Sequence, residues 1–291
     1  MSTLTIEKVS KHYGKKQVLK DISVSFEGGK LYGLLGRNGA GKTTLIDMIT
    51  GKQAVSSGQI TMDGRKAPGN DWVQGHIFAM GEQNIYPEDM SVKGVFSWMQ
   101  LRYSRFNWDE AYRLSRIFHL DLKHRFCKLS TGQQSLVKLV CGLALDVDIK
   151  IFDEPVLGLD AVHRDVFYKE LLKSYAENPC TVILSTHLIE EVSDLLERVV
   201  VMDEGEIKVD SAVEDLLREA YCVSGPRQDV EVFVKGRPVL ETEFLQGFAS
   251  ATVQERLTED IRRVGEQAGL QFAGVSLNRL FIDLTKEAVE Q

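Results

Sequence analysis

Nine residues near the N-terminus, "GRNGAGKTT" at 36–44, decide the fold class of this 291-residue chain. The segment fits the phosphate-loop pattern G-x-x-x-x-G-K-[ST]. The apolar run "LYGLL" precedes it, and the helical segment "TLIDMIT" follows it. A glycine-rich turn between a strand and a helix points backbone N–H groups and the positive end of the helix dipole at a phosphate. We therefore expect an α/β domain that binds a nucleotide.

The phosphate loop predicts roles for individual side chains. Lys42 should reach the β- and γ-phosphates, and the hydroxyl of Thr43 should bind Mg²⁺. The alternative, a glycine-rich turn with a chance lysine, does not account for the strand and the helix on either side. The predicted nucleotide-binding residues of the loop are Gly36, Arg37, Asn38, Gly39, Ala40, Gly41, Lys42, Thr43 and Thr44.

Two carboxylates follow a second apolar run, "IKIFDE" at residues 149–154. Asp153 is placed to hold Mg²⁺ through water, and Glu154 to orient and polarise the attacking water. An acidic pair after a strand is usually only a solvated strand end, but the phosphate loop favours the catalytic interpretation. His187 ends the next apolar run, "TVILST", and we expect its imidazole to hydrogen-bond the γ-phosphate and the water, although a single histidine is more often structural.

A second helix start suited to an anion lies in "KLSTGQQSLVKL", residues 128–139. A Ser-Thr-Gly turn precedes apolar and polar residues at helical spacing, as at a helix N-terminus that holds a phosphate. One nucleotide needs only one phosphate loop. This segment therefore requires a different partner.

Apolar patterning predicts the overall organisation. The first 65 residues alternate apolar and polar residues as strands do, residues 91 to about 126 are helical and rich in aromatics, and compact apolar runs then alternate with helical segments. Alternating strands and helices indicate an α/β domain with a mostly parallel sheet. We place this first domain at residues 1–217, with a helical subdomain at about 86–146, and a small C-terminal α/β accessory domain at 218–291.

Composition narrows the classes of function. The net charge of −7 argues against general nucleic-acid binding, because a basic face supplies most of that affinity. No apolar run approaches the roughly 18–20 residues that a spanning helix needs, and the N-terminus lacks a signal sequence. We expect a cytosolic protein with reduced thiols, since no metal or disulfide spacing joins the four cysteines, Cys127, Cys141, Cys180 and Cys222.

Together these segments resemble the nucleotide-binding subunits of ABC transporters, from residue 1 to about 210 and in the family's order. "GRNGAGKTT" corresponds to the Walker A loop, and "IKIFDEP" to Walker B with its catalytic glutamate. "LSTGQ" is similar to the signature LSGGQ, "VLGLD" to the D-loop and "STH" to the switch histidine. The resemblance implies an ATP hydrolase with an antiparallel β subdomain and a helical subdomain, in which Tyr13 stacks on adenine.

The resemblance also gives the second helix start a partner. In this family two ATPase domains meet head to tail, so that Ser130, Gly132 and Gln133 of one chain close over the γ-phosphate bound by the other, with Asp160 at the same interface. The implied ligands are ATP and Mg²⁺. The implied partners are a second ATPase subunit, identical or related, and transmembrane permease subunits that hold the protein at the inner face of the cell membrane. No nucleic-acid partner is expected.

Two positions depart from the family pattern. Thr131 stands where the signature most often has glycine. A gapless alignment anchored on "IYPEDMSV" puts Gly81 where the family has the glutamine of its Q-loop, and Glu82 and Gln83 follow. We take Gln83 as the ATP and Mg²⁺ contact, which requires a loop two residues shorter, and the choice between Gln83 and Glu82 stays open.

The tail favours an exporter. "VSLNRLFIDLT" resembles the end of bacterial ATPase subunits that export drugs, antibiotics and peptides, and "GLDAVHRDVFY" is typical of the same group. The aromatic residues between 86 and 126 either fill the helical subdomain or line a groove for a permease helix. Two alternatives stay open: a non-transport ABC ATPase acting on ribosomes or DNA, and an antibiotic-sensing signalling module.

Overall fold

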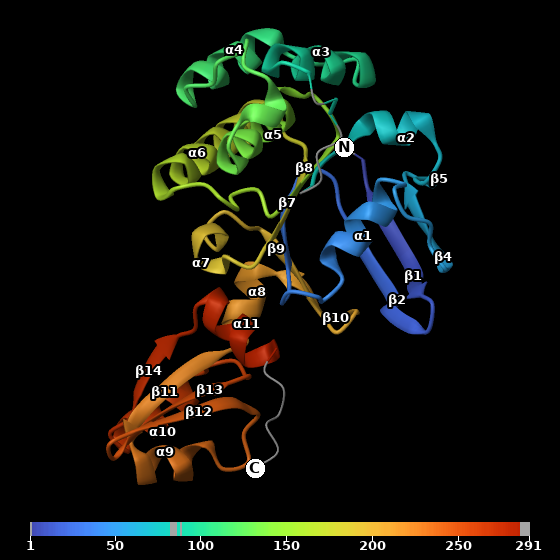
Figure 1. Cartoon of the computed structure of the whole chain (residues 1–291). Coiled ribbons are helices and arrows are strands. Elements are labelled where there is room, and N and C mark those ends of the chain that lie inside the picture. The colour runs from blue at the N-terminus through green and yellow to red at the C-terminus, as the bar shows by residue number, and fades with distance from the viewer. Residues whose placement is uncertain (1, 82–85, 88, 286–291) are drawn as a thin grey trace. The chain divides into compact units, whose positions relative to one another are not determined.

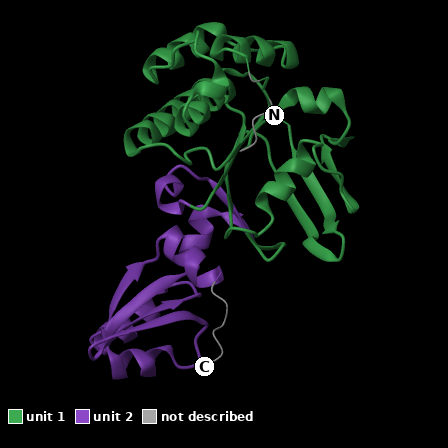
Figure 2. Ribbon diagram, viewed as in Figure 1, with its two compact units in different colours: residues 1–187, 202–208 green, residues 188–201, 209–291 purple. Residues whose placement is uncertain are grey.

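Two compact units make up the chain in this computed structural model (Figure 2). Residue 217, where the sequence predicts the end of the first domain, lies within helix α8 of the second unit, and that boundary stays a prediction. The first unit comprises residues 1–187 and 202–208, and the second comprises residues 188–201 and 209–291. The structure describes residues 2–81, 86–87 and 89–285.

A six-stranded sheet has the order β10-β9-β3-β8-β7-β6, and its strands β3, β8, β7 and β6 run parallel within the first unit (Figure 1). Every residue of β3, β7 and β8 is buried, which explains why these strands are mainly apolar rather than alternating. Because parallel strands share one carboxyl edge, the residues that follow β3, β7 and β8 meet there. The strands are β3 (Leu31–Leu35), β6 (Ile77–Met80), β7 (Ile149–Asp153), β8 (Thr181–Thr186), β9 (Arg198–Asp203) and β10 (Glu206–Ala212).

An antiparallel sheet in the order β2-β1-β4-β5 lies in the same unit. Strand β2 alternates buried residues with more exposed ones from Ile22 to Phe26, as the sequence predicted, whereas register shifts after Ile6 interrupt the alternation of β1. Gly58, the second residue of β4, has a φ of +82°, and a Cβ there would collide with the carbonyl oxygen of Lys8 on β1, so only glycine allows this approach. The elements here are β1 (Leu4–Tyr13), β2 (Lys16–Phe26), β4 (Ser57–Met62), β5 (Arg65–Lys66), and the helices α1 (Lys42–Ile49) and α2 (Asp71–His76).

Besides its two sheets, this unit contains a group of helices between residues 92 and 177. Polar side chains determine where several of these helices begin. Ser91, Asn107, Ser130 and Asp160 each accept a hydrogen bond from a backbone N–H of the first helical turn. Most of the aromatic side chains are buried, among them Phe96, Phe106, Phe118 and Phe126. The helices are α3 (Val92–Arg102), α4 (Trp108–Ile117), the single turn η1 (Phe126–Lys128), α5 (Thr131–Ala144) and α6 (Ala161–Glu177).

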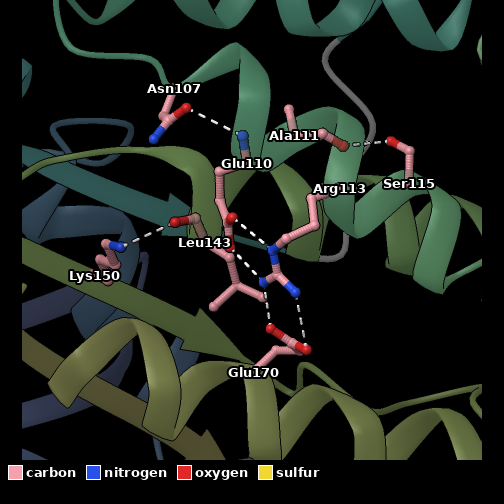
Figure 3. A network of polar contacts seen from close by, with 8 residues as sticks. All are labelled: Asn107, Glu110, Ala111, Arg113, Ser115, Leu143, Lys150 and Glu170. Atoms are coloured by element: carbon pink, nitrogen blue, oxygen red, sulfur yellow. Dashed lines mark hydrogen bonds and ion pairs between the residues drawn. The ribbon is translucent and has the colours of Figure 1, made fainter. Parts of the chain in front are cut away.

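An ion-pair network joins α4 to α6 (Figure 3). The guanidinium of Arg113 donates to Glu110 at 2.8 and 2.6 Å and to both carboxylate oxygens of Glu170. Arg113 holds the pKa of Glu110 below its ordinary value through these hydrogen bonds. The two helices are therefore linked by an ion pair.

The second unit contains an antiparallel sheet in the order β12-β13-β11-β14, built as β-α-β-β-α-β. Its core gathers Tyr221, Val223, Val230, Ala251 and Val253. Its elements are α7 (Ile189–Val192), α8 (Val213–Arg218), β11 (Tyr221–Pro226), α9 (Arg227–Val234), β12 (Val239–Leu245), β13 (Phe248–Val253), α10 (Glu259–Gln267), β14 (Gln271–Gly274) and α11 (Leu277–Thr285).

The parallel core, the antiparallel sheets and the helices confirm the predicted α/β fold class. In the described part of the chain, every helix is either too short or too polar to cross a bilayer.

Candidate active site

The phosphate loop connects β3 to α1 and closes around a lysine. Gly39 and Gly41 have φ values of 86° and 103°, which glycine adopts without strain. The side chain of Lys42 is buried, and its Nζ donates to the carbonyl oxygen of Gly36 at 2.6 Å. A cavity of about 320 Å³ is lined by the loop residues 38–44 together with Lys16, Val18, Asp153 and Glu154. The structure thus brings the predicted loop and the acidic pair to one site.

Burial lowers the pKa of Lys42 from its ordinary value, whereas the carboxylates of Glu154 and Asp153 act in the opposite direction. An ammonium group that has lost part of its hydration gains more from an anion than one in open water. Lys42 is therefore suited to pair with a phosphate in the cavity.

Asp153 ends β7 and is held by two hydroxyl groups. Its Oδ2 accepts from Thr43 Oγ1 at 2.8 Å, and its Oδ1 accepts from Ser185 Oγ at 2.6 Å. Register explains the second contact, since Asp153 of β7 lies opposite Ser185 of β8. A carboxylate and a hydroxyl are oxygen ligands of the kind that Mg²⁺ takes alongside nucleotide phosphates. The pair Thr43 and Asp153 therefore fits a magnesium site.

Glu154 turns away from the line of the strand. Its φ of 48° is left-handed, which costs a non-glycine residue about 1 kcal/mol or more. Its backbone N–H donates to the carbonyl oxygen of Ser185 at 2.8 Å. Its Oε2 lies 2.9 Å from His187 Nδ1 and accepts from Thr186 Oγ1 at 3.5 Å. The carboxylate and the imidazole are thus joined at the open edge of the sheet, where a pair of this kind can orient a water molecule.

The signature segment forms the N-terminus of α5. Ser130 and Gln133 make a reciprocal capping box, in which each side chain accepts from the backbone N–H of the other residue. Ser130 and Gln133 are exposed. A Cβ on Gly132 would lie 2.7 Å from the carbonyl oxygen of Gly158, so this glycine allows the segment "VLGLD" to pack against the helix start. None of these residues lines the cavity at the phosphate loop.

The two remaining predicted contacts lie on exposed surface. Tyr13 ends β1 and pairs in register with Lys16, which lines the phosphate cavity, and Lys11 Nζ lies 5.0 Å from the centre of the Tyr13 ring. Asp160 caps α6 by accepting from the backbone N–H of His163 at 2.9 Å. Hydrogen bonds from the backbone and the side chain of His163 lower the pKa of Asp160. Glu82 and Gln83 lie outside the described residues.

A second cavity, of about 350 Å³, adjoins the acidic pair. Sequence reasoning missed Lys138, which lines it and whose Nζ donates to the carbonyl oxygen of Gly81 at 2.9 Å. It also missed Ser185, whose contact with Asp153 follows from the register between β7 and β8. The walls of this cavity are Met80, Gly81, Thr131, Gln134, Ser135, Lys138, Asp153, Glu154 and Leu157.

Comparisons with known proteins agree with this architecture. Residues 19–157 match the family model of the ABC transporter. The chain is 32% identical to the ABC transporter ATP-binding protein AlbC of Bacillus subtilis over 77% of this chain and 99% of that protein. It is 34% identical to the taurine import ATP-binding protein TauB of Ruegeria pomeroyi over 69% of this chain and 78% of TauB.

Solved structures give the same answer. One described as the ATP-binding subunit of an ABC transporter superposes with a TM-score of 0.67 and 26% identity, over 74% of this chain and 92% of that one. The phosphate loop, the acidic pair after β7 and this similarity lead to one conclusion. This chain belongs to the family of ABC transporter ATP-binding proteins, and it is an ATP-hydrolysing subunit that powers transport.

Proposed function

We propose that this protein hydrolyses MgATP in a head-to-tail dimer and so drives export through separate transmembrane subunits. The proposal rests on three contacts at one edge of the sheet. Lys42 Nζ donates to the carbonyl oxygen of Gly36 in the loop, the Thr43 hydroxyl donates to Asp153, and the Glu154 carboxylate forms a hydrogen bond with His187. These contacts bring together the groups that phosphoryl transfer to water needs.

Each group has a distinct task in the proposed reaction. Lys42 and the N–H groups of the loop bind the β- and γ-phosphates. Thr43 and Asp153 hold Mg²⁺, which supplies charge neutralisation at the phosphates when bound. Glu154 orients the water and takes its proton, and His187 holds the carboxylate and hydrogen-bonds the γ-phosphate. Tyr13 stacks on adenine.

The dimer explains the exposed helix start of α5. We assign Ser130, Gly132, Gln133 and Asp160 to the ATP held by the Walker A loop of the second subunit, identical or related. Ser130 and Gln133 are exposed and already shaped by the capping box, so closing over a phosphate requires little local rearrangement. Loss of the γ-phosphate removes the contacts between the halves, which allows hydrolysis to open the dimer.

A third cavity, of about 520 Å³, is the proposed seat of a permease helix. Trp98, Arg102 and Tyr103 of the α3 region line it, and Leu101 beside it is 87% exposed. Exposed apolar side chains next to an aromatic hollow are typical of a groove that takes an amphipathic helix. Through this contact the protein would sit at the inner face of the membrane.

Export is the proposed direction because of the tail. Its segment "VSLNRLFIDLT" contains α11, in which Leu277, Leu280 and Phe281 are buried. TauB is named for taurine import, so membership of the family leaves the direction open. We also propose residues 1–217 as the ATPase domain, with its helical subdomain at about 86–146, and residues 218–291 as an accessory domain.

The test is recovery of tagged Glu154→Gln protein from detergent-solubilised native membranes with MgATP present. We expect a multi-span membrane protein in stoichiometric amount, and about tenfold less of it with the added substitution Leu101→Asp. Val232→Asp is the matched control, since Val232 is 76% exposed on α9. Ribosomes or DNA-repair proteins without a membrane protein would contradict the proposal.

The recovered complex then decides the direction. In inside-out vesicles an exporter takes its cargo into the lumen when ATP is added outside. ATP hydrolysis that responds to an antibiotic without any uptake would identify a signalling module instead.

A further inference from the structure

We propose that Lys138 is a positioning residue for ATP hydrolysis. Its side chain links the signature helix α5 to the main chain at the end of β6, beside the catalytic carboxylates. The proposal rests on the roles assigned above to Asp153 and Glu154. It concerns a side chain that lies in neither the phosphate loop, the acidic pair nor the signature motif.

Lys138 is an unusual residue for its place in α5. Its neighbours Leu136, Val137, Leu139 and Val140 are apolar and buried, and Lys138 itself is only 8% exposed. A buried ammonium group is costly unless a polar partner replaces its hydration. Its Nζ meets the carbonyl oxygen of Gly81 at 2.9 Å, a good distance for a charge-assisted hydrogen bond.

The partner lies at a critical point of the sheet. Gly81 directly follows β6, whose last residue Met80 is in register with Phe152 of β7. Gly81 is therefore level with Asp153, the next residue of β7. Because glycine has no side chain, another element can hold this residue only through its backbone, and Lys138 does so through the carbonyl oxygen.

One face of α5 carries both the signature end and Lys138. Thr131, Gln134, Ser135 and Lys138 are three to four residues apart, so they share a face, and all four line the cavity that also contains Asp153 and Glu154. A displacement of α5 would therefore move Gly81 and one wall of the space around Glu154. Through Lys138, the position of α5 would therefore affect the position of the groups around Glu154, where water is activated.

This geometry predicts an effect on hydrolysis rather than on ATP binding. The cavity at the phosphate loop shares Asp153 and Glu154 with this one, but its other walls are the loop residues 38–44 with Lys16 and Val18, and Lys138 does not line it. Misplacing a catalytic group by about 1 Å can lower a rate by about 100-fold, so a loosened wall should act mainly on kcat.

The experiment compares full-length variants under MgATP saturation. Lys138→Met keeps the apolar stem and removes the ammonium group. We expect kcat to fall about tenfold or more, with the KM for MgATP and the Kd for a fluorescent ATP analogue within about threefold of wild type. Lys138→Arg, which retains the charge and the reach, should recover most of the loss.

Lys150→Met is the matched control. Lys150 is also buried, lies in β7, and donates to the carbonyl oxygen of Leu143 at 3.5 Å (Figure 3). Neither of these two residues lines the catalytic cavity. The Lys150→Met variant should keep kcat within about twofold of wild type at a temperature where both Lys150→Met and Lys138→Met are folded. If Lys138→Met does not fold, Lys138→Gln replaces it, because the glutamine amide is one bond too short to reach Gly81 and should also lose about tenfold in kcat.

The outcomes separate this inference from the proposed function. A kcat within twofold of wild type in Lys138→Met or Lys138→Gln, or an equal loss in Lys150→Met, would overturn the role of Lys138. A loss of ATP affinity in parallel with kcat would overturn it as well, since a merely structural lysine would act that way. If the wild-type chain and its membrane complex hydrolyse no ATP, the proposed function itself fails.

Discussion

At the scale of the residue, two adjacent carboxylates have different environments. Asp153 is buried and held on both oxygens by hydroxyl groups, whereas Glu154 is turned by its left-handed backbone towards His187. The pattern of an apolar strand followed by two acids predicted both positions. It did not predict Ser185, because the contact depends on the register between β7 and β8, which no local pattern encodes.

Removing the Lys42 ammonium group should weaken ATP binding. A charge-assisted hydrogen bond to a phosphate contributes about 1.5–3 kcal/mol, so Lys42→Ala should raise the Kd for ATP by about 10- to 100-fold. Titration with a fluorescent ATP analogue at constant ionic strength measures this change.

Lys20→Ala removes the same charge from the surface of the same unit. Lys20 pairs with Glu206 at 3.5 Å and does not line the cavity. Its Kd should stay within about twofold of wild type. Equal affinities for all three proteins would refute the assignment of Lys42.

At the scale of the element, sequence patterns identify strands and helix starts more readily than they identify which residues of different elements contact each other. Fully buried parallel strands are mainly apolar, as β7 is apart from Lys150 and Asp153, and Ser130 with Gln133 forms the expected helix start. "DVEVFV" alternates like a strand, yet it lies in α9, where Val230 packs on the sheet and Val232 faces solvent. Lys138 and Gly81 are far apart in sequence, so their contact leaves no local signal.

The link between α4 and α6 gives an element-scale prediction. Arg113→Met leaves the carboxylates of Glu110 and Glu170 facing each other without their cation, which should cost about 1–2 kcal/mol of unfolding free energy. Tryptophan fluorescence during urea unfolding reports it, because all three tryptophans, Trp72, Trp98 and Trp108, lie in the first unit.

Arg105→Met is the control for that measurement. Arg105 pairs with Asp146 at 3.3 Å, but both side chains are more than 60% exposed, at 69% and 62%. Its loss should change the unfolding free energy by no more than about 0.5 kcal/mol. A cost as large as that of Arg113→Met would show that the network does not join the helices.

At the scale of the whole molecule, the sequence predicted two α/β parts, and the order of the motifs predicted the family. What the sequence could not predict is where the chain divides in space, because residues 202–208 belong to the first unit although residues 188–201 belong to the second. Ser130, Gly132 and Gln133 of the signature segment do not line the phosphate cavity of their own chain, so the proposed function requires a second chain.

The most direct test of that requirement is the mass of the full-length Glu154→Gln protein in MgATP, measured by light scattering after size exclusion. The rate of ATP hydrolysis by this variant should be about 100-fold or more below that of wild type, so that ATP stays bound. We predict a mass of twice the 32.7 kDa of one chain with MgATP and of a single chain with MgADP, and a single chain again in MgATP when Ser130→Arg is added. A single chain in MgATP, or ATPase activity close to wild type, would contradict it.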